Sequence, residues 1–402
     1  MEDFQLFKDV VNFNCSYGTV PKVVREYQND LSVTCESNPY EWFTKTYREK
    51  LESVRIELAA FLSCRKEDFV FVDNTSSGAN SVFNSIDFRS NSAVVITDIA
   101  YGLIVNLANK MNRLFGSTVH VVEVDVFNPN NLPERIIRAI DHLAQKGYTV
   151  ELVCCEHIAS CPGILLPIDK VARACSSRHI PLMVDAAHAI GQVEINLEEL
   201  GACGVTYWIT DCHKWFFSPK GSAIMWVHKE KQNNVHPVID CATIGTKGCI
   251  TQKNQLQLTE FEYRFLYLGT KDYTPWLSIQ KALEFVDCKG GYLYIINRNR
   301  QLAIKAQQSL CDEIQTGTPF ANESTVSMAN IPLPTAISTQ FIASYLMDTL
   351  RDVYNTYVVI YEYPFNSSRY FLRLCLQLFI TDYDINFLAI AIKDLLASIP
   401  DK

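Results

Sequence analysis

Short apolar runs alternate with amphipathic stretches from about residue 67 to about residue 228, a pattern typical of α/β folds. The runs have the length of buried strands, and the segments between them have the period of helices. The predicted strands are Phe69–Val72, Ser92–Thr97, His120–Val124, Val150–Cys154, Ile180–Val184, Thr206–Thr210 and Ala223–Val227. Helical segments such as Pro133–Lys146 and Ile168–Arg178 separate them. We therefore expect one large domain with a mostly parallel sheet.

The two ends of the chain have different patterns. Helices are predicted over Lys22–Leu31 and Tyr47–Leu62, in an arm that packs on the large domain or on a neighbouring subunit. A long polar helix from about Tyr292 precedes the later elements. These are strands at Tyr357–Tyr361 and Tyr370–Leu376 and a closing helix from Asp384. The expected division is an N-terminal arm with helices at 1–62, a large domain at 63–285 and a small C-terminal domain at 286–402.

Composition narrows the class of protein. The chain has 402 residues, of which 48% are hydrophobic, enough for a large core. Its 36 basic and 44 acidic residues give a net charge of −8 without a dense basic block, so nucleic acid is not an expected partner. The first residues lack a secretory pattern, and no apolar run is long enough for a membrane span. We expect a cytoplasmic protein with no membrane partner. The 14 cysteines lack CxxC pairs, which favours reduced thiols over disulfides or a metal site.

Two polar residues at strand ends carry the strongest chemical signal. Asp185 follows the apolar run 180–184, and Lys214 lies 29 positions later, just past the run that ends at Thr210. Ligands of open α/β sheets bind beyond the carboxyl ends of strands. A carboxylate for a pyridine nitrogen and a lysine for an aldehyde are the groups that pyridoxal 5'-phosphate chemistry needs. The pair predicts an enzyme that uses this cofactor on an amino acid.

Other polar residues after strands fit the same cofactor, although each also has an ordinary structural explanation. Residues 73–80 place small hydroxyl side chains before a helical segment at Ala79–Ser85, where they would hold a phosphate group or only cap the helix. Tyr101 would lie on the face of a flat ring, and His188 would contact the ring oxygen. A metal site is not predicted, because His157, His188 and His213 lack the spacing of metal ligands.

Three motifs near the predicted lysine resemble those of a known family. They are Asp-Ala-Ala-His-Ala-Ile-Gly at 185–191, Asp-Cys-His-Lys-Trp at 211–215 and Ser-Pro-Lys-Gly-Ser-Ala at 218–223. They resemble the class V aminotransferase family of fold-type I enzymes, and more narrowly its isopenicillin N epimerase-like branch, which includes hercynylcysteine sulfoxide lyases. Further similar segments lie at 16–21, 74–80, 268–272 and 372–377. The resemblance implies a mostly parallel sheet in a large domain and a smaller α+β C-terminal domain.

The resemblance also implies which residues hold the cofactor's phosphate. Ser76 and Ser77 would do so together with His213. Thr270 would reach a phosphate in the partner subunit of a homodimer. The active sites would then lie at the interface between the two subunits.

The remaining implied roles concern the ring and the substrate. Tyr101 would stack on the ring, Asp185 would pair with its nitrogen, and Lys214 would attach the cofactor and move the substrate's α-proton. Ser160 would hydrogen-bond in the polar turn after the fourth strand. Arg373 would grip the substrate α-carboxylate as a bidentate fork, or serve only as a strand residue.

The chain departs from the family pattern at several positions. Cys15 replaces a glycine, Ser160 an asparagine and Lys271 an arginine, and Phe379-Ile380-Thr381 stands where the family has Tyr-Asn-Thr. None of these changes removes Asp185 or Lys214. They bear on the identity of the substrate more than on the cofactor.

The same cofactor supports several reactions. Desulfurases resembling this family use a mobile cysteine on a C-terminal loop, but no cysteine lies between Cys311 and Cys375. We therefore expect C–S β-elimination from a cysteine conjugate or its sulfoxide, with Tyr101 as a candidate acid for the leaving group. The alternatives are an amino acid epimerase, racemase or aminotransferase, and with less support a cysteine desulfurase or a non-catalytic scaffold protein.

Overall fold

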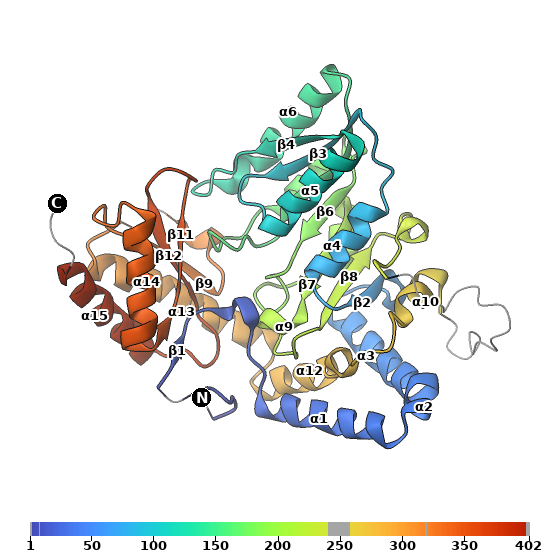
Figure 1. Cartoon of the computed structure of the whole chain (residues 1–402), viewed down its shortest axis with the longest axis horizontal. Coiled ribbons are helices and arrows are strands. Elements are labelled where there is room, and N and C mark those ends of the chain that lie inside the picture. Colours follow the sequence, from blue (N-terminus) through green and yellow to red (C-terminus); the bar gives the residue numbers. More distant parts are fainter. Residues whose placement is uncertain (1, 8, 240–257, 318–319, 399–402) are drawn as a thin grey trace.

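A seven-stranded sheet forms the centre of the larger part of the molecule (Figure 1). The computed structural model describes residues 2–7, 9–239, 258–317 and 320–398. The strand order is β2-β8-β7-β6-β5-β3-β4, and β3 to β7 pair in parallel, whereas β8 pairs antiparallel with β2 and β7. The strands are β2 (Phe69–Val72), β3 (Ser92–Thr97), β4 (Thr118–Val122), β5 (Thr149–Glu156), β6 (Leu182–Asp185), β7 (Val205–Asp211) and β8 (Ala223–Val227).

Alternate side chains of each strand enter two different apolar clusters, as expected for a sheet covered on both faces. Val94 and Ile96 of β3 pack in the cluster that includes α4 and α5, whereas Ala93 and Val95 pack in the cluster that includes α6 and α7. The helices of the first face are α4 (Thr75–Asn84) and α5 (Gly102–Phe115). Those of the second are α6 (Leu132–Gln145), α7 (Ile168–Ser176) and α8 (Leu197–Cys203).

The C-terminal part contains a separate antiparallel sheet in the order β11-β12-β9. Its strands are β9 (Met328–Pro332), β11 (Val359–Glu362) and β12 (Tyr370–Cys375). The helices α13 (Tyr292–Glu313), α14 (Gln340–Tyr354) and α15 (Asp382–Ser398) accompany it, as Figure 1 shows in orange and red. Every residue of β12 is buried, so Arg373 lies in the interior of the molecule.

The single strand predicted over residues 357–361 is wrong. Residues 357–361 do not form a single strand, because β10 (Thr356–Tyr357) and β11 belong to different sheets. β10 pairs in parallel with β1 (Val11–Asn12), and β11 pairs antiparallel with β12. Val358 lies between them and is buried, so the apolar run continues although the ladder changes partner.

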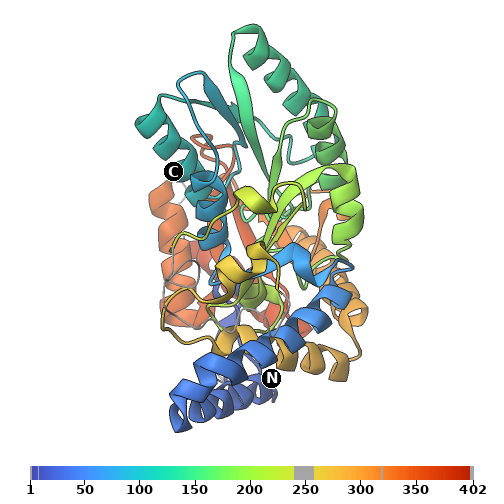
Figure 2. The same ribbon diagram turned by 90° about the vertical axis from the view of Figure 1, so that its right-hand side faces the viewer.

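The N-terminal segment joins the two parts of the molecule. After β1, a short 3-10 turn at Cys15–Tyr17 contacts α9 (Cys212–Trp215), the helix that carries Lys214. Helices α1 (Lys22–Ser37) and α3 (Tyr47–Phe61) then pack on α11 (Thr274–Leu277) and α12 (Ile279–Cys288). Figure 2 shows α1 at the end of the molecule opposite α6.

Gly18 allows this segment to approach α9. Its φ is +59°, and a Cβ atom at this position would lie 1.7 Å from the main-chain oxygen of His213. Only glycine fits such a contact in this backbone conformation. The close approach places the N-terminal segment against α9, the helix that carries Lys214.

The helices that remain are shorter. They are α2 (Pro39–Glu41), which precedes a π-helical turn at Trp42–Thr46, and α10 (Glu260–Leu266), which packs on β2. Among the described residues, no helix is both long and apolar enough to cross a membrane.

Candidate active site

A cavity of about 470 Å³ lies beyond the carboxyl ends of β5, β6 and β7. The start of α4 and the N-terminal segment around Ser16 close it, and Val359 of β11 contributes from the C-terminal part. The predicted residues that line this cavity are Ser76, Tyr101, Ser160, Asp185, His188, His213 and Lys214. The topology thus brings together side chains that are far apart in the sequence.

Asp185 ends β6 and is buried. Its Oδ1 accepts a hydrogen bond of 3.1 Å from the Ala187 amide. Burial raises the pKa of this carboxyl group, and the nearby Lys214 partly offsets that rise. A carboxylate held in a dry site beside a cation suits a protonated ring nitrogen.

His188 is a neutral hydrogen-bond donor toward the cavity. Its Nδ1 accepts from the indole Nε1 of Trp215 at 3.1 Å, so in the neutral ring the proton lies on Nε2. Burial, followed by the nearby Lys214, lowers the pKa of His188 well below its ordinary value. This tautomer fits the predicted contact with a ring oxygen.

Lys214 on α9 is paired with a carboxylate that the sequence reasoning missed. Its Nζ lies 3.1 Å from Oδ2 of Asp211, the last residue of β7. The other oxygen, Oδ1, accepts a hydrogen bond of 2.7 Å from the Thr75 amide at the start of α4. Asp211 stands in the same five-residue motif as Lys214, so its position after a strand was the available signal.

The start of α4 has a capping residue of its own. The Asn74 side chain accepts from the Ser77 amide at 2.8 Å and from the Ser77 hydroxyl at 3.1 Å. Ser77 therefore faces its cap and does not line the cavity, whereas Ser76 does. Of the two serines predicted to hold a phosphate, the structure brings Ser76 to the site.

His213 faces the same region with its other ring nitrogen. Its Nδ1 lies 3.0 Å from the main-chain oxygen of Ser222, and its Nε2 lies 3.9 Å from Oδ2 of Asp211. Burial lowers the pKa of His213, an effect that Asp211 opposes. With Nδ1 donating to Ser222, the neutral ring carries a lone pair on Nε2, the nitrogen on the side of Asp211.

Arg373 lies directly behind the cavity wall and is fully buried. Its guanidinium donates to the Ser160 main-chain oxygen at 2.7 Å, to Ser160 Oγ at 3.0 Å and to Ser16 Oγ at 2.8 Å. Asn14 Oδ1 accepts a weaker bond of 3.3 Å. These acceptors are neutral, and Arg373 Nε has no hydrogen-bond partner among the described residues. A buried cation held in this way favours an anion nearby.

Two predicted residues lie at or beyond the rim. Tyr101 directly precedes α5 at the mouth of the cavity, and 59% of its surface is exposed. Thr270 is exposed, hydrogen-bonds with the Tyr267 hydroxyl group and does not line the cavity. Thr270 therefore makes no contact with the site of its own chain.

Glu156 is a second residue that the sequence reasoning did not assign. It ends β5 opposite Asp185 in the ladder and lines the cavity. Thr97 Oγ1 donates to Glu156 Oε2 at 2.7 Å, while Oε1 is buried without a partner in the described part of the chain. Burial raises the pKa of Glu156 to about 7. Two carboxyl groups on neighbouring strands thus face one cavity.

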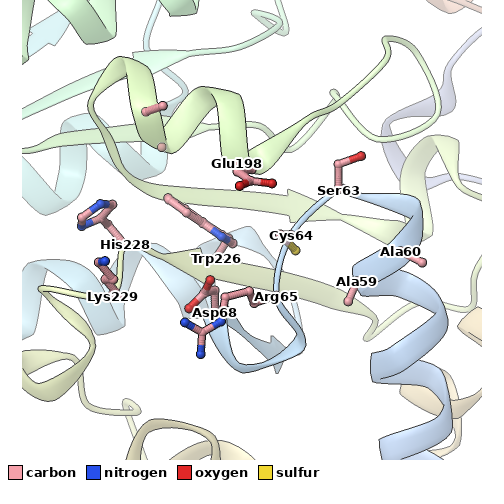
Figure 3. Close-up of a pocket in the computed structure, with 12 residues that line it drawn as sticks. Ala59, Ala60, Ser63, Cys64, Arg65, Asp68, Glu198, Trp226, His228 and Lys229 are labelled. Atoms are coloured by element: carbon pink, nitrogen blue, oxygen red, sulfur yellow. The ribbon is translucent and has the colours of Figure 1, made fainter.

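A further cavity, of about 500 Å³, lies at the opposite end of the sheet (Figure 3). Trp226 and His228 at the end of β8 line it, with Arg65 before β2 and Glu198 on α8. None of the predicted site residues lies there. Among the described residues, no group of three or more metal-binding side chains occurs in either place.

The family of the chain follows from comparison with known proteins. Residues 18–350 match the model of the aminotransferase class-V family. The chain belongs to this family. Its cofactor is pyridoxal 5'-phosphate. The cavity fits this group, since it offers a buried carboxylate, a neutral histidine donor, an amine and a helix N-terminus.

Curated members of the class V family similar to this chain have different activities. The L-cysteine desulfhydrase of Arabidopsis thaliana is 28% identical over 340 residues, 81% of this chain and 71% of that protein. Hercynylcysteine sulfoxide lyase of Schizosaccharomyces pombe is 23% identical and covers 97% of this chain and 95% of its own. Isopenicillin N epimerase of Amycolatopsis lactamdurans is 22% identical, and the match covers 98% of this chain and 97% of that protein.

Solved structures of the class V family share the fold. The cystine C–S lyase C-DES, in complex with its reaction product cysteine persulfide, gives a TM-score of 0.78 with 18% identity. The match covers 96% of this chain and 97% of that one. The predicted fold class, a fold-type I architecture with a mostly parallel sheet, is confirmed.

Proposed function

We propose that this class V enzyme is a lyase that breaks the C–S bond of a cysteine conjugate or its sulfoxide by β-elimination. One water molecule would hydrolyse the fragment left after elimination, so that the products would be pyruvate, ammonia and the released sulfur fragment. The observation that carries the proposal is the placement of Lys214 and Asp185 in one cavity, whose lining includes no cysteine among the described residues. Cys375, the first cysteine after Cys311, is fully buried in β12.

Asp185, His188 and Lys214 each hold or move one proton. When bound, pyridoxal 5'-phosphate supplies an electron sink for the charge that develops at the substrate α-carbon. Asp185 would hold the proton of the ring nitrogen in place, and His188 would donate its Nε2–H to the ring oxygen. The Lys214 amine removes the α-proton, and the C–S bond then breaks with its electron pair leaving on sulfur.

Substrate recognition rests on Arg373 and the two hydroxyl groups in front of it. Ser16 and Ser160 accept hydrogen bonds from the guanidinium and line the cavity, so their own O–H groups are free to donate to the α-carboxylate. The positive charge behind them strengthens those bonds. This arrangement selects an α-amino acid.

The mouth of the cavity is where a leaving group would depart. Tyr101 lies there with an exposed ring and would protonate the leaving sulfur group, besides contacting the cofactor. We further propose that Ser76 and His213 bind the phosphate and that Ser77 supports the start of α4. Thr270, which faces solvent in one chain, would reach the phosphate of the partner subunit in a homodimer.

The experiment that tests the function measures pyruvate release from a panel of cysteine S-conjugates and their sulfoxides. Lys214→Ala serves as the blank, and Lys229→Ala, in the cavity at the opposite end of the sheet, is the matched control. We expect release that is lost in Lys214→Ala and kept in Lys229→Ala. Racemised substrate or a new keto acid without pyruvate would contradict elimination and indicate epimerisation or transamination.

A further inference from the structure

Asp211 connects three elements at the end of the cavity where the phosphate is proposed to bind. It is 4% exposed and ends β7. Its Oδ1 accepts from the Thr75 amide of α4 at 2.7 Å, and its Oδ2 lies 3.1 Å from Lys214 Nζ on α9. The carboxylate thus already occupies one of the N–H groups that a helix N-terminus offers to an anion.

The two lysines near Asp211 already have partners: Lys214 pairs with Asp211 itself, and Lys220, which lies near His213, donates to the Gly18 main-chain oxygen. Lys214 is its ion-pair partner, and His213 Nε2 lies 3.9 Å from Oδ2. Burial lowers the pKa of His213, so its ring favours the neutral form. On β6, Asp185 adds a further carboxylate, whose pKa is raised mainly by burial and also by Asp211. The neighbouring Cys212 thiol is buried, and burial raises its pKa.

A phosphate dianion at this place would therefore meet a carboxylate and a lone pair. Two like charges a few ångströms apart repel strongly in a partly dry site. A phosphate ester that keeps one proton avoids part of this repulsion, because its O–H can donate to Asp211 or to His213 Nε2. The second ionisation of such esters lies near pH 6, so retaining that proton at neutral pH requires uptake from solvent.

We propose that Asp211 makes phosphate binding at the start of α4 depend on proton uptake, so that the site takes a phosphate monoester in its singly protonated form. The inference rests on the proposed function, which assigns this helix start to the cofactor's phosphate. Asp211 is in this sense a residue that determines how tightly, and at which pH, the cofactor binds. It also keeps the start of α4 capped before the phosphate arrives.

The test measures binding to the cofactor-free protein by titration calorimetry at pH 5.5 and pH 8. Pyridoxamine 5'-phosphate is the ligand, because it lacks the aldehyde that would react with Lys214. Pyridoxamine, which lacks the phosphate, corrects for titration of the ring and the amine. The variant is Asp211→Asn, whose side-chain oxygen can still accept from Thr75 while the negative charge is lost.

We expect the phosphorylated ligand to lose at least about tenfold in affinity between the two pH values in the unmodified chain. In Asp211→Asn the loss should be much smaller, and binding at pH 8 should be at least about tenfold tighter than in the unmodified chain. Calorimetry at pH 8 in two buffers of different ionisation enthalpy should show proton uptake that the variant lacks.

Glu156→Gln is the matched control, because it removes a carboxyl group from another wall of the same cavity. It should change the binding of both ligands by a similar factor. If Asp211→Asn binds the phosphorylated ligand as the unmodified chain does at both pH values, the inference is overturned while the phosphate site stands. If pyridoxamine and its phosphate bind equally well to both proteins, the phosphate site is wrong, and the inference fails with it.

Discussion

Two buried carboxyl residues of the site, Asp211 and Glu156, received no role from the sequence, although Asp211 stands in the motif at 211–215. Asp185 and Lys214 could be predicted because each follows an apolar strand and the chemistry of the cofactor requires both. Glu156 and Asp211 also follow strands, but a carboxylate at a strand end is equally a solvent-facing residue until its neighbours are known. Only the register of β5 with β6 and the position of α4 place them in the cavity.

Glu156 should make the stability of the cofactor-free protein depend on pH. Burial raises its pKa from 4.5 to about 7, so the folded chain keeps a proton that the unfolded chain releases in this interval. Stability contributed by this group is therefore present below pH 4.5 and is lost as the pH rises to about 7. Between pH 5 and pH 8 this group should lower the free energy of unfolding by roughly 2 to 3 kcal/mol, and Glu156→Gln should not show that decrease.

Urea unfolding of the cofactor-free protein at pH 5 and pH 8 measures this difference. Glu151→Gln is the control, because Glu151 lies on the same strand and is only partly buried. An equal pH dependence in the unmodified chain and in Glu156→Gln would show that the carboxyl group does not hold its proton in the fold.

At the scale of elements, the strands of the large sheet were predictable because each is a continuous apolar run. Their ends shift by a few residues, since a ladder ends where its partner ends and the sequence does not reveal the partner. Residues 357–361 were predicted as one strand because their apolar run is continuous, although the chain changes sheets at Val358. The helix after the hydroxyl residues was predicted at Ala79–Ser85, but α4 begins earlier, at Thr75, because Asn74 caps it and Ser77 turns to that cap.

The contact between the N-terminal segment and α9 gives a prediction at the same scale. Gly18→Ala would place a Cβ 1.7 Å from the His213 main-chain oxygen, in a backbone conformation with φ of +59° that disfavours side chains. The segment must then move away from α9, taking Ser16 from Arg373. We expect a loss of about 1 to 3 kcal/mol in stability and a larger KM for the amino acid substrate.

Thermal unfolding and steady-state kinetics measure the two effects. Gly147→Ala is the matched control, because its φ is +84° but a Cβ there would have nothing within 4 Å. It should lose stability from backbone strain alone and keep its KM. If Gly18→Ala behaves like Gly147→Ala, the contact with α9 has no role in substrate binding.

At the scale of the molecule, the site combines both parts of the chain. The large sheet supplies Asp185 and Lys214, while Arg373 comes from a buried strand of the small sheet and contacts Asn14, Ser16 and Ser160 in the cavity wall. The sequence motif near Arg373 suggested substrate binding, but not that two hydroxyl groups stand in front of it. Side-chain contacts between distant segments of this kind depend on tertiary packing.

The exposed position of Thr270 leads to a prediction about assembly. If it serves the partner's site in a homodimer, Lys214→Ala and Thr270→Arg should each have low activity alone, whereas a refolded mixture should regain activity. The mixed dimer then has one site with both residues intact. A mixture that stays inactive while light scattering confirms dimers would place Thr270 outside the partner's site.

The most direct test of the central claim is to locate the lysine that attaches the cofactor. The protein loaded with pyridoxal 5'-phosphate is reduced with borohydride, digested and mapped by mass spectrometry. The account predicts the label on Lys214, and its absence from that peptide in Lys214→Ala. A label confined to another lysine, or no label on a protein that holds the cofactor, would contradict it.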